Sequence, residues 1–539
     1  MSRLGEALLA LLQPFPKLAA ALHYLRHPRR FAAKVLGGIR RVDAGRSYRA
    51  AIARGRFVVE AGPPAPLTHF TVLMPIFRVA EEHLRAAIAS VRNQTHGNFE
   101  LLLGDDASPD PHVGRVLAEA ARDDARVRTF RRPATGGIAV ASDDLLREAR
   151  GDWVAFLDHD DLFHPRALEL AARALLARPD TDWLFTDEDK VDEADRHSEP
   201  CLKPGWSRHL LLTFNYVCHL RVVRTAMLRR VGSHRAGFDG AQDYDLALRV
   251  LAAGGRFTHL PGVLYHWRTV HGSMARAAGA KPAAHERALR ALTDHAASFP
   301  RGGAVTADVL LEPASFFRVR RRPDPGLSIA ALLPPGTSPC RLATETVTVA
   351  PFPPSAEQVA RLARGLTSEV VALLPPGWNH PTAFEELLAL LGVPGTALVA
   401  ARQCGGRRVT CSGWLVDSRG RAWDPMAGLS VFDPGYLNLA LVPGPRHAPP
   451  PVGWVAWRRD LLDGWEAAAD EPGPWRLPLG LARIGREVVA TPTVSLELRD
   501  APVPPLPPSG LPACRVDWLE AIGAVRRRSR IVRSGEVMP

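Results

Sequence analysis

The sequence predicts an α/β protein built around a mostly parallel sheet with helices on both faces. From residue 67 to about 310, short apolar runs alternate with stretches whose apolar residues recur at helical spacing. The runs are apolar without interruption, as in strands that are buried on both faces. Two of them end directly on clusters of aspartates, at the end of the strand where parallel sheets bind ligands. These observations favour a ligand-binding or catalytic unit.

The elements of this unit follow one another in a regular order. Four apolar runs, each too short for a helix, predict strands over 70–75, 99–104, 127–130 and 153–157. Three stretches between them predict helices over 84–91, 112–124 and 139–149. Farther along, a helix is expected to begin near Gln242, and residues 264–268 are expected to follow another strand.

Composition divides the chain into four parts. Residues 1–66 predict short, arginine-rich amphipathic helices that end in a linker rich in proline and alanine. Residues 67–310 are the α/β unit, a proline-rich part covers 311–505, and a basic tail covers 506–539.

The net charge lies at the two ends of the chain. The 539 residues include 68 Lys+Arg and 56 Asp+Glu, a net charge of +12. Residues 1–60 hold 12 basic and 3 acidic side chains and residues 511–539 hold 6 and 3, which leaves the part between them neutral. This distribution argues against a nucleic-acid partner. It favours peripheral docking on an anionic membrane, and a solvated basic face is the alternative.

Segment lengths and cysteine usage indicate a compartment. Charges and prolines interrupt the apolar N-terminus, so neither a spanning helix nor a signal peptide is predicted. The six cysteines include no CxxC pair, so neither a disulfide scaffold nor a zinc ribbon is expected. We expect a cytoplasmic protein that contacts the inner face of the cytoplasmic membrane.

Three carboxylates follow the fourth predicted strand. Asp158, Asp160 and Asp161 offer oxygen ligands that suit Mg²⁺ or Mn²⁺. The alternative is a helix N-cap at Asp161, with Pro165 in the first turn. Because one aspartate suffices for a cap, the surplus negative charge favours a cation.

Three other polar clusters each allow two interpretations. Asp105 and Asp106 could form a turn and a cap, or could accept hydrogen bonds from a nucleotide base or ribose. Asp243 and Asp245 lie near a predicted helix start, where the helix dipole favours carboxylates, and capping explains only one of them. His266 could be structural or a ligand.

Over residues 70–276 the chain resembles a bacterial family-two glycosyltransferase of the GT-A fold, of the type that builds surface polysaccharides. The matching segments occur in the family's order and spacing over about 200 residues. They are Met74-Pro75-Ile76-Phe77, Ser90-Val91-Arg92-Asn93-Gln94-Thr95, Asp105-Asp106-Ala107-Ser108, Thr135-Gly136-Gly137-Ile138, Asp158-His159-Asp160-Asp161, Asp187-Glu188-Asp189-Lys190, Gly240-Ala241-Gln242-Asp243-Tyr244-Asp245-Leu246 and Tyr265-His266-Trp267-Arg268.

The resemblance implies a nucleotide site. Asp106, with Asp105, would contact the uracil or thymine base of a nucleotide sugar. Pro75 and Phe77 would belong to the same site, with the ring of Phe77 on the base. The family's usual tyrosine-asparagine is Phe77-Arg78 here, so stacking is expected to persist while one polar contact changes.

The resemblance also implies a metal site and a catalytic base. Asp158 and Asp160 match the family's DxD motif, with Asp160 as the more direct ligand of Mn²⁺ or Mg²⁺ and Asp158 nearer the ribose. His266 would complete the metal site, and Asp243 matches the base. The usual glutamate before that base is Gln242 here. Seven residues are expected near the donor sugar or the acceptor: Asp187, Glu188, Asp189, Gln242, Asp245, Trp267 and Arg268.

The part after residue 310 predicts a divergent repeat of this unit. Residues 327–334, 371–377, 380–385 and 486–498 parallel the first strand, the DxD strand, the helix after it and the run through His266. In this alignment Pro375 replaces Asp158, Gly377 replaces Asp160 and Glu497 replaces His266. We expect a degenerate, non-catalytic GT-A-like domain, and an unrelated α/β domain is the alternative.

The predicted function is inverting, metal-dependent glycosyl transfer. A cation would neutralise the leaving nucleoside diphosphate, and a base would deprotonate the acceptor hydroxyl. The expected donor is a UDP- or dTDP-sugar, and the expected acceptor is a saccharide or a lipid-linked saccharide. The alternatives are another nucleotide-sugar or phosphoryl-transfer enzyme and a non-catalytic carbohydrate-binding scaffold.

Overall fold

The computed structural model describes residues 68–497, with gaps. The gaps are 204, 270–281, 300–302, 312–313, 322, 324–325, 339–340, 376–380, 406–407, 412–414, 417–421, 424–443, 446–452 and 471–475. The predictions for residues 1–66, Gly377 and 506–539 lie outside the described residues. No helix in the described part is long and apolar enough to cross a bilayer.

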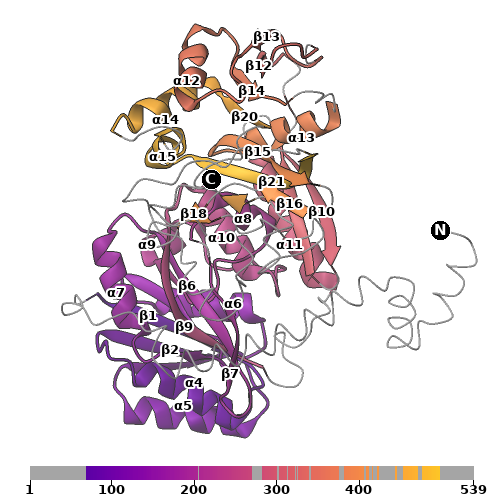
Figure 1. Cartoon of the computed structure of the whole chain (residues 1–539). Helices are drawn as coiled ribbons and strands as arrows, with labels where there is room; N and C mark the ends of the chain where they lie inside the picture. The colour runs from indigo at the N-terminus through magenta and orange to yellow at the C-terminus, as the bar shows by residue number, and fades with distance from the viewer. Residues whose placement is uncertain are drawn as a thin grey trace, which may run out of the picture.

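A nine-stranded, mostly parallel sheet forms the first unit, as predicted (Figure 1). Its strand order is β3-β2-β1-β4-β8-β6-β9-β5, and β7 pairs with β6. Strands β8, β5 and β7 are antiparallel to the strands they pair with. The bounds are β1 (Phe70–Ile76), β2 (Phe99–Asp105), β3 (Val127–Arg131), β4 (Trp153–Phe156), β5 (Leu162–Phe163), β6 (Trp183–Val191), β7 (His197–Cys201), β8 (Arg221–Arg224) and β9 (Phe257–Arg268).

Helices cover both faces because successive strand residues point to opposite sides. Leu73 and Val154 face one apolar core, whereas Val72 and Ala155 face the other. Helices α6 (Ile138–Glu148), α8 (Arg208–Thr213), α9 (Thr225–Val231) and α10 (Gln242–Ala252) contribute to the first core. Helices α4 (Glu81–Arg92), α5 (Pro111–Asp123) and α7 (Ala167–Ala177) contribute to the second.

The predicted strands and helices are confirmed to within a few residues, with one exception. Residues 264–268 form the last part of β9 itself and do not follow a strand. The alternative interpretation of Asp161 as a helix N-cap is excluded, since Leu162–Phe163 is a strand and α7 begins at Ala167 after Arg166. The peptide after Asp161 pairs with β9, which prevents a helix from starting there.

An eight-stranded sheet forms a second unit. Its strand order is β13-β12-β14-β20-β15-β21-β19, and β16 pairs with β15. The strands are β12 (Ile329–Leu333), β13 (Glu345–Thr348), β14 (Val370–Leu373), β15 (Thr396–Gly405), β16 (Arg408–Cys411), β19 (Gly444–Pro445), β20 (Trp454–Trp457) and β21 (Glu487–Glu497). The helices are α12 (Ala356–Gly365), α13 (Pro381–Leu391), α14 (Arg458–Ala467) and α15 (Arg476–Arg483), and β17 (Leu415–Val416) pairs separately with β18 (Ala422–Trp423).

The two sheets have the same strand order and the same directions over six neighbouring strands. The series β2-β1-β4-β8-β6-β9 corresponds to β13-β12-β14-β20-β15-β21, and in both the fourth strand is antiparallel to its neighbours. The hairpin β6–β7 corresponds to β15–β16. Helices α6, α7, α9 and α10 have counterparts in α12, α13, α14 and α15 at the same places in the chain order.

The pairing registers agree with the repeat predicted from sequence. Leu73 pairs with Phe156 in the first sheet, and Leu332 pairs with Leu373 in the second. Asp189 pairs with His266, and Cys404 pairs with Glu497. Glu497 therefore stands where the sequence alignment puts it, at the position of His266. The registers support the prediction of a divergent copy.

A hairpin joins the two units. β10 (Ala304–Leu311) and β11 (Ala314–Arg320) follow α11 (Pro282–Ala297), and Phe317 and Val319 belong to a core of the first unit. The boundary predicted after residue 310 falls within this hairpin. The hairpin was not predicted, because the sequence of β10 does not reveal that the next strand packs on the same core. Arg320 of this hairpin pairs with Glu386 of α13 at 2.7 Å, so the hairpin contacts both units.

The units meet at the edges where their parallel strands begin. Within the first unit, the segment before α8 lies at the start edge of the sheet, because Trp206 stacks on Phe257 at the start of β9 with a ring-centre distance of 4.2 Å. Glu487, the first residue of β21, accepts hydrogen bonds from the Arg208 backbone at 2.6 Å and the Ser207 hydroxyl at 3.2 Å. The edges where the parallel strands end therefore lie away from this junction.

Candidate active site

The ends of the parallel strands bring together most of the predicted site residues. Asp105 ends β2, Asp158 follows β4, and Asp189 and His266 are neighbours near the ends of β6 and β9. Because β8 runs in the opposite direction, its first residue, Arg221, lies at this same edge. We call this set of strand ends the carboxyl edge.

The loop that carries Asp158 and Asp160 is fastened to β9. Asp161, fully buried, accepts hydrogen bonds from the Tyr265 hydroxyl at 2.5 Å and the Arg268 backbone at 2.8 Å. The Arg268 guanidinium also donates to the Asp160 carbonyl at 3.1 Å. Asp161 is thus a structural anchor that leaves the other two carboxylates to other partners.

The carboxylates at this edge repel one another. Burial, together with the negative charges of Asp243 and Asp160, raises the pKa of Asp158 to about 6, although Arg221 acts in the opposite direction. Excess carboxylate in a poorly solvated place favours a bound cation. Asp158 and Asp160 therefore fit a divalent metal by their donor chemistry.

Asp243 lies in the first turn of α10, beside a buried arginine and a buried histidine. The Arg221 guanidinium lies 2.8 Å and His234 Nε2 lies 3.2 Å from Asp243 Oδ1. Burial raises the pKa of Asp243, but Arg221 and His234 outweigh burial and hold that pKa well below its usual range. Asp243 is therefore ionised and oriented at neutral pH, as a proton acceptor must be.

Arg221 itself is only partly satisfied within the described residues. Its side chain is 4% exposed, and its Nε and Nη1 atoms have no hydrogen-bond partner. It also lies over the Phe156 ring at 4.4 Å. The unpaired N–H groups of Arg221 could donate to an anionic ligand, and the carboxylates beside them could bind a cation.

His266 belongs to a compact group with Asp189 and His197. The ligand atoms of these three residues all lie within 4.8 Å of one another, the one such group of three in the described part of the chain. Asp158 and Asp160 do not form a group of this kind with His266 there. The structure thus brings all three predicted metal ligands to one edge without gathering them at one point.

Asp105 and Asp106 hold the turns around the predicted nucleotide site. Asp106 accepts hydrogen bonds from the Gly136 and Gly137 backbones at 2.9 and 2.8 Å. Asp105 accepts one from the Ser108 backbone at 2.8 Å, while its Oδ2 atom is buried without a hydrogen bond, 3.3 Å from Arg131. Both carboxylates are therefore engaged in the turns of this edge, and their contacts with a base stay a prediction.

Pro75 and Phe77 lie at the end of β1. The Pro75 carbonyl lies 3.2 Å from His159 Nδ1, so β1 contacts the loop of Asp158. Phe77 is half-buried, with the Arg78 guanidinium 5.3 Å from its ring centre. A ring in this place is accessible to a planar ligand.

Asp187 and Glu188 are occupied within the fold. Asp187 is 1% exposed and accepts hydrogen bonds from His259 Nε2 and the backbones of Lys203 and Gly262, at 2.8, 2.8 and 3.0 Å. Glu188 pairs with the buried Lys203 ammonium at 3.2 Å. Their substrate contacts stay a prediction.

The remaining predicted substrate residues have different surroundings. The Gln242 side chain accepts from the Gly240 backbone at 2.5 Å, and Asp245 is held by Arg235 and Arg249. Trp267 lies 5.9 Å from the Lys190 ammonium, at the carboxyl edge. Arg268, besides its bonds to the Asp158–Asp161 loop, pairs with Asp195 at 3.0 Å.

Sequence reasoning missed four residues at this edge: Arg221, His234, His197 and Tyr265. None lies within a recognisable acidic cluster, and each contacts a partner far away in the chain or on a different element. Arg221 begins an antiparallel strand, and no local pattern reveals that a strand is reversed.

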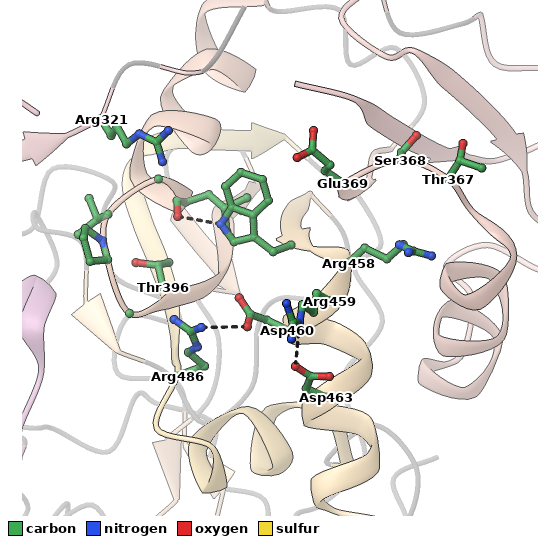
Figure 2. Close-up of a pocket in the computed structure, with 16 residues that line it drawn as sticks. Arg321, Thr367, Ser368, Glu369, Thr396, Arg458, Arg459, Asp460, Asp463 and Arg486 are labelled. Carbon is green, nitrogen blue, oxygen red and sulfur yellow. Dashed lines mark hydrogen bonds and ion pairs between the residues drawn. The ribbon is translucent and has the colours of Figure 1, made fainter. Parts of the chain in front are cut away.

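A cavity of about 770 Å³ lies elsewhere, at the start edge of the second sheet (Figure 2). Arg321, Trp457 and Arg486 line it, and Arg486 pairs with Asp460 at 3.2 Å. Its walls come from the segments before β14, β15 and β21, opposite to the ends where sheets of this kind bind substrates. It is therefore not the counterpart of the carboxyl edge.

Comparison with a family model agrees with this geometry. Residues 71–235 match the model described as glycosyl transferase family 2. The match runs from β1 through α9 and ends before α10 and β9.

Curated proteins that are similar to part of the chain include the following three. The uncharacterized protein y4gI of Sinorhizobium fredii is 40% identical over 267 residues, 49% of this chain and 29% of that protein. The O-antigen biosynthesis protein RfbC of Myxococcus xanthus is 37% identical over 253 residues, 47% of this chain and 20% of that protein. The UDP-Glc:alpha-D-GlcNAc-diphosphoundecaprenol beta-1,3-glucosyltransferase WfgD of Escherichia coli is 35% identical over 106 residues, 20% of this chain and 40% of that protein. The chain thus spans less than a third of the length of the first two.

Proposed function

We propose that this chain, which carries a domain of glycosyl transferase family 2, moves a sugar from a UDP- or dTDP-sugar to a saccharide or lipid-linked acceptor, with inversion. The observation that carries the proposal is the convergence of Asp158, Asp160 and the ion-paired Asp243 at the carboxyl edge of a GT-A-type sheet.

The DxD pair is assigned to a metal. Asp158 and Asp160, with His266 nearby, would hold Mn²⁺ or Mg²⁺, which would neutralise the charge that develops on the leaving nucleoside diphosphate. The pKa of Asp158, raised by burial and by repulsion from Asp243 and Asp160, supports this assignment, because a bound cation stabilises the ionised carboxylate.

Asp243 is assigned to the acceptor. Ionised by Arg221 and His234, it would accept the proton of the acceptor hydroxyl as the oxygen attacks the anomeric carbon. Attack on the side opposite to the leaving group, without an enzyme nucleophile, inverts the configuration. Asp106, Asp105 and Phe77 are assigned to the nucleotide base.

The names of the relatives suggest the biological setting. One takes part in O-antigen biosynthesis, and another uses UDP-Glc and an acceptor on diphosphoundecaprenol. We assign this chain to surface-polysaccharide synthesis at the cytoplasmic face of the membrane, where such lipid-linked acceptors and nucleotide sugars meet. The basic residues 1–60 are assigned to peripheral contact with anionic lipid.

The second unit is assigned as a degenerate copy that braces the first. The shared strand order and registers support duplication, and Pro375 and Glu497 stand where the first unit has Asp158 and His266. The first unit holds the chemistry.

The test uses the full chain and a panel of UDP- and dTDP-sugars, first in a thermal-shift screen with Mn²⁺ and then in a donor-turnover assay. Chelation should abolish turnover. Asp243→Asn should lower it by about 10²–10⁴-fold while nucleotide binding persists. Glu497→Gln, at the position that corresponds to His266, is the matched control and should retain full turnover. Full activity in chelator would refute the metal, and unchanged turnover in Asp243→Asn would refute the base.

A further inference from the structure

We propose that Asp189 and His197 are positioning residues that orient the His266 imidazole for a divalent cation. The inference rests on the proposed function, because it assigns His266 to the metal side of the carboxyl edge. The three residues lie outside the DxD motif, on the neighbouring strands β6, β7 and β9.

Asp189 contacts both histidines with separate oxygens. Its Oδ1 lies 2.6 Å from His266 Nδ1, and its Oδ2 lies 2.7 Å from His197 Nδ1. Asp189 is fully buried, so the carboxylate has no solvent to compete with these bonds. If each Nδ1 donates a proton, the Nε2 atom of His266 is left as the basic nitrogen, which is the form that binds a metal.

The hairpin β6–β7 keeps the two rings against each other. Val191 pairs with His197 across the hairpin, and Asp189 pairs with His266 across β6 and β9. The rings of His197 and His266 meet edge to face with a centre distance of 4.8 Å. The ring of His164 lies on another side of His266, with a centre distance of 6.3 Å. A ring enclosed in this way cannot rotate freely, so its ligand atom is preorganised.

The second unit provides an internal comparison. By the registers of β15 and β21, Cys404 replaces Asp189 and Glu497 replaces His266. Both members of the pair have changed in the copy that has also lost Asp158. Had Asp189 served only to hold β6 against β9, the same two strands in the copy would have the same need for it.

In an alternative arrangement, the same three side chains are all metal ligands. Asp189, His197 and His266 could themselves surround one metal ion, with both Nδ1 atoms as ligands. Substitution of His197 by asparagine separates the two cases. The amide N–H of asparagine can still donate to Asp189, but an amide is a poor replacement for an imidazole ligand.

The experiment measures Mn²⁺ binding to the full chain with UDP present, by the loss of the free-ion electron paramagnetic resonance signal. His197→Ala is expected to weaken Mn²⁺ affinity about 10-fold and His266→Ala more, within the range of partners that orient metal ligands. His197→Asn is expected to restore affinity to within about 2-fold of the original, as a conservative hydrogen-bond donor should.

The control is His259→Asn. His259 makes a similar buried bond to Asp187 between the same two strands, at 2.8 Å, but away from His266. It should lower the unfolding temperature and leave Mn²⁺ affinity unchanged.

Three results would overturn the inference: unchanged affinity in His197→Ala, equal losses in His197→Asn and His197→Ala, or an equal loss in the control. If the unsubstituted chain and the His197 variants all bind Mn²⁺ equally well and turn over donor, the positioning role of Asp189 and His197 is refuted but the proposed function stands. If the original chain does neither, the proposed function fails as well.

Discussion

The two α/β units differ at their carboxyl edges far more than in their cores. Leu73 and Leu332 occupy the same position in corresponding sheets, and both are fully buried. At the edge, however, Arg221 of β8 corresponds to Trp454 of β20, and Asp189 of β6 corresponds to Cys404 of β15.

This contrast separates what the fold needs from what the chemistry needs. A sheet with the same order and register persists without the buried charges, so apolar burial and strand pairing suffice to specify it. Buried charges are costly to desolvate, and a site that no longer needs them can replace them with apolar residues. The proposed function expects this contrast, because it gives the buried charges of the first unit a role in the site rather than in the stability of the sheet.

Removal of Arg221 should have the largest effect. Arg221→Met leaves the largely buried Asp243 with only His234 beside it, and loss of one partner of a buried pair costs up to about 3–5 kcal/mol of unfolding free energy. Turnover should fall by roughly 100-fold or more, since the base loses its orientation. Chemical denaturation and the donor-turnover assay measure the two effects.

The matched variant is Trp454→Phe, at the corresponding position of the second unit. It should cost about 1–2 kcal/mol in packing and leave turnover within about 2-fold. Comparable losses of turnover in both variants would break the contrast between the two edges.

The next test compares the cores. Leu73→Ala and Leu332→Ala should each lower the free energy of unfolding by about 2–5 kcal/mol. Val393, from the second unit, is part of a core of the first, so both variants should shift one shared thermal transition. Leu176→Ala, at a side chain 67% exposed, is the control and should change little. Two separate transitions, each sensitive to one variant, would show that the units are independent.

The smallest expected effect concerns the junction. Burial raises the pKa of Glu487 above its ordinary value of 4.5, although its bond from the Arg208 backbone acts in the opposite direction. A carboxyl group with a raised pKa in the folded state stabilises below the unfolded pKa, and this stability is lost as pH rises through the folded pKa.

Glu487→Gln should therefore reduce the loss of stability that occurs as the pH rises above 4.5, the ordinary pKa of the carboxyl group. The amide oxygen can still accept the Arg208 bond, so the change should be about 1 kcal/mol or less. Thermal unfolding over a pH series measures it. A steeper pH dependence in the variant would show that Glu487 is ionised and stabilising in the folded chain.

Much of the first unit could be predicted from local patterns. Continuous apolar runs identified β1 to β4, and the aspartates after them identified the carboxyl edge. The structural role of Asp161 could not be predicted, because its partners Tyr265 and Arg268 follow more than 100 residues later. Arg221 was missed for a related reason: its place depends on the reversed direction of β8, which only the assembled sheet determines.

The contact between the starting edges of the two sheets limits where the chain can be truncated to produce a folded fragment. A fragment limited to residues 71–235 would lack Asp243 and all of β9, so the loop of Asp158 would lose its anchors. One that ends at residue 310 would keep these but lose β11 and leave Ser207 and Arg208 without Glu487. The shortest recombinant product expected to behave as a monodisperse protein therefore runs through β21.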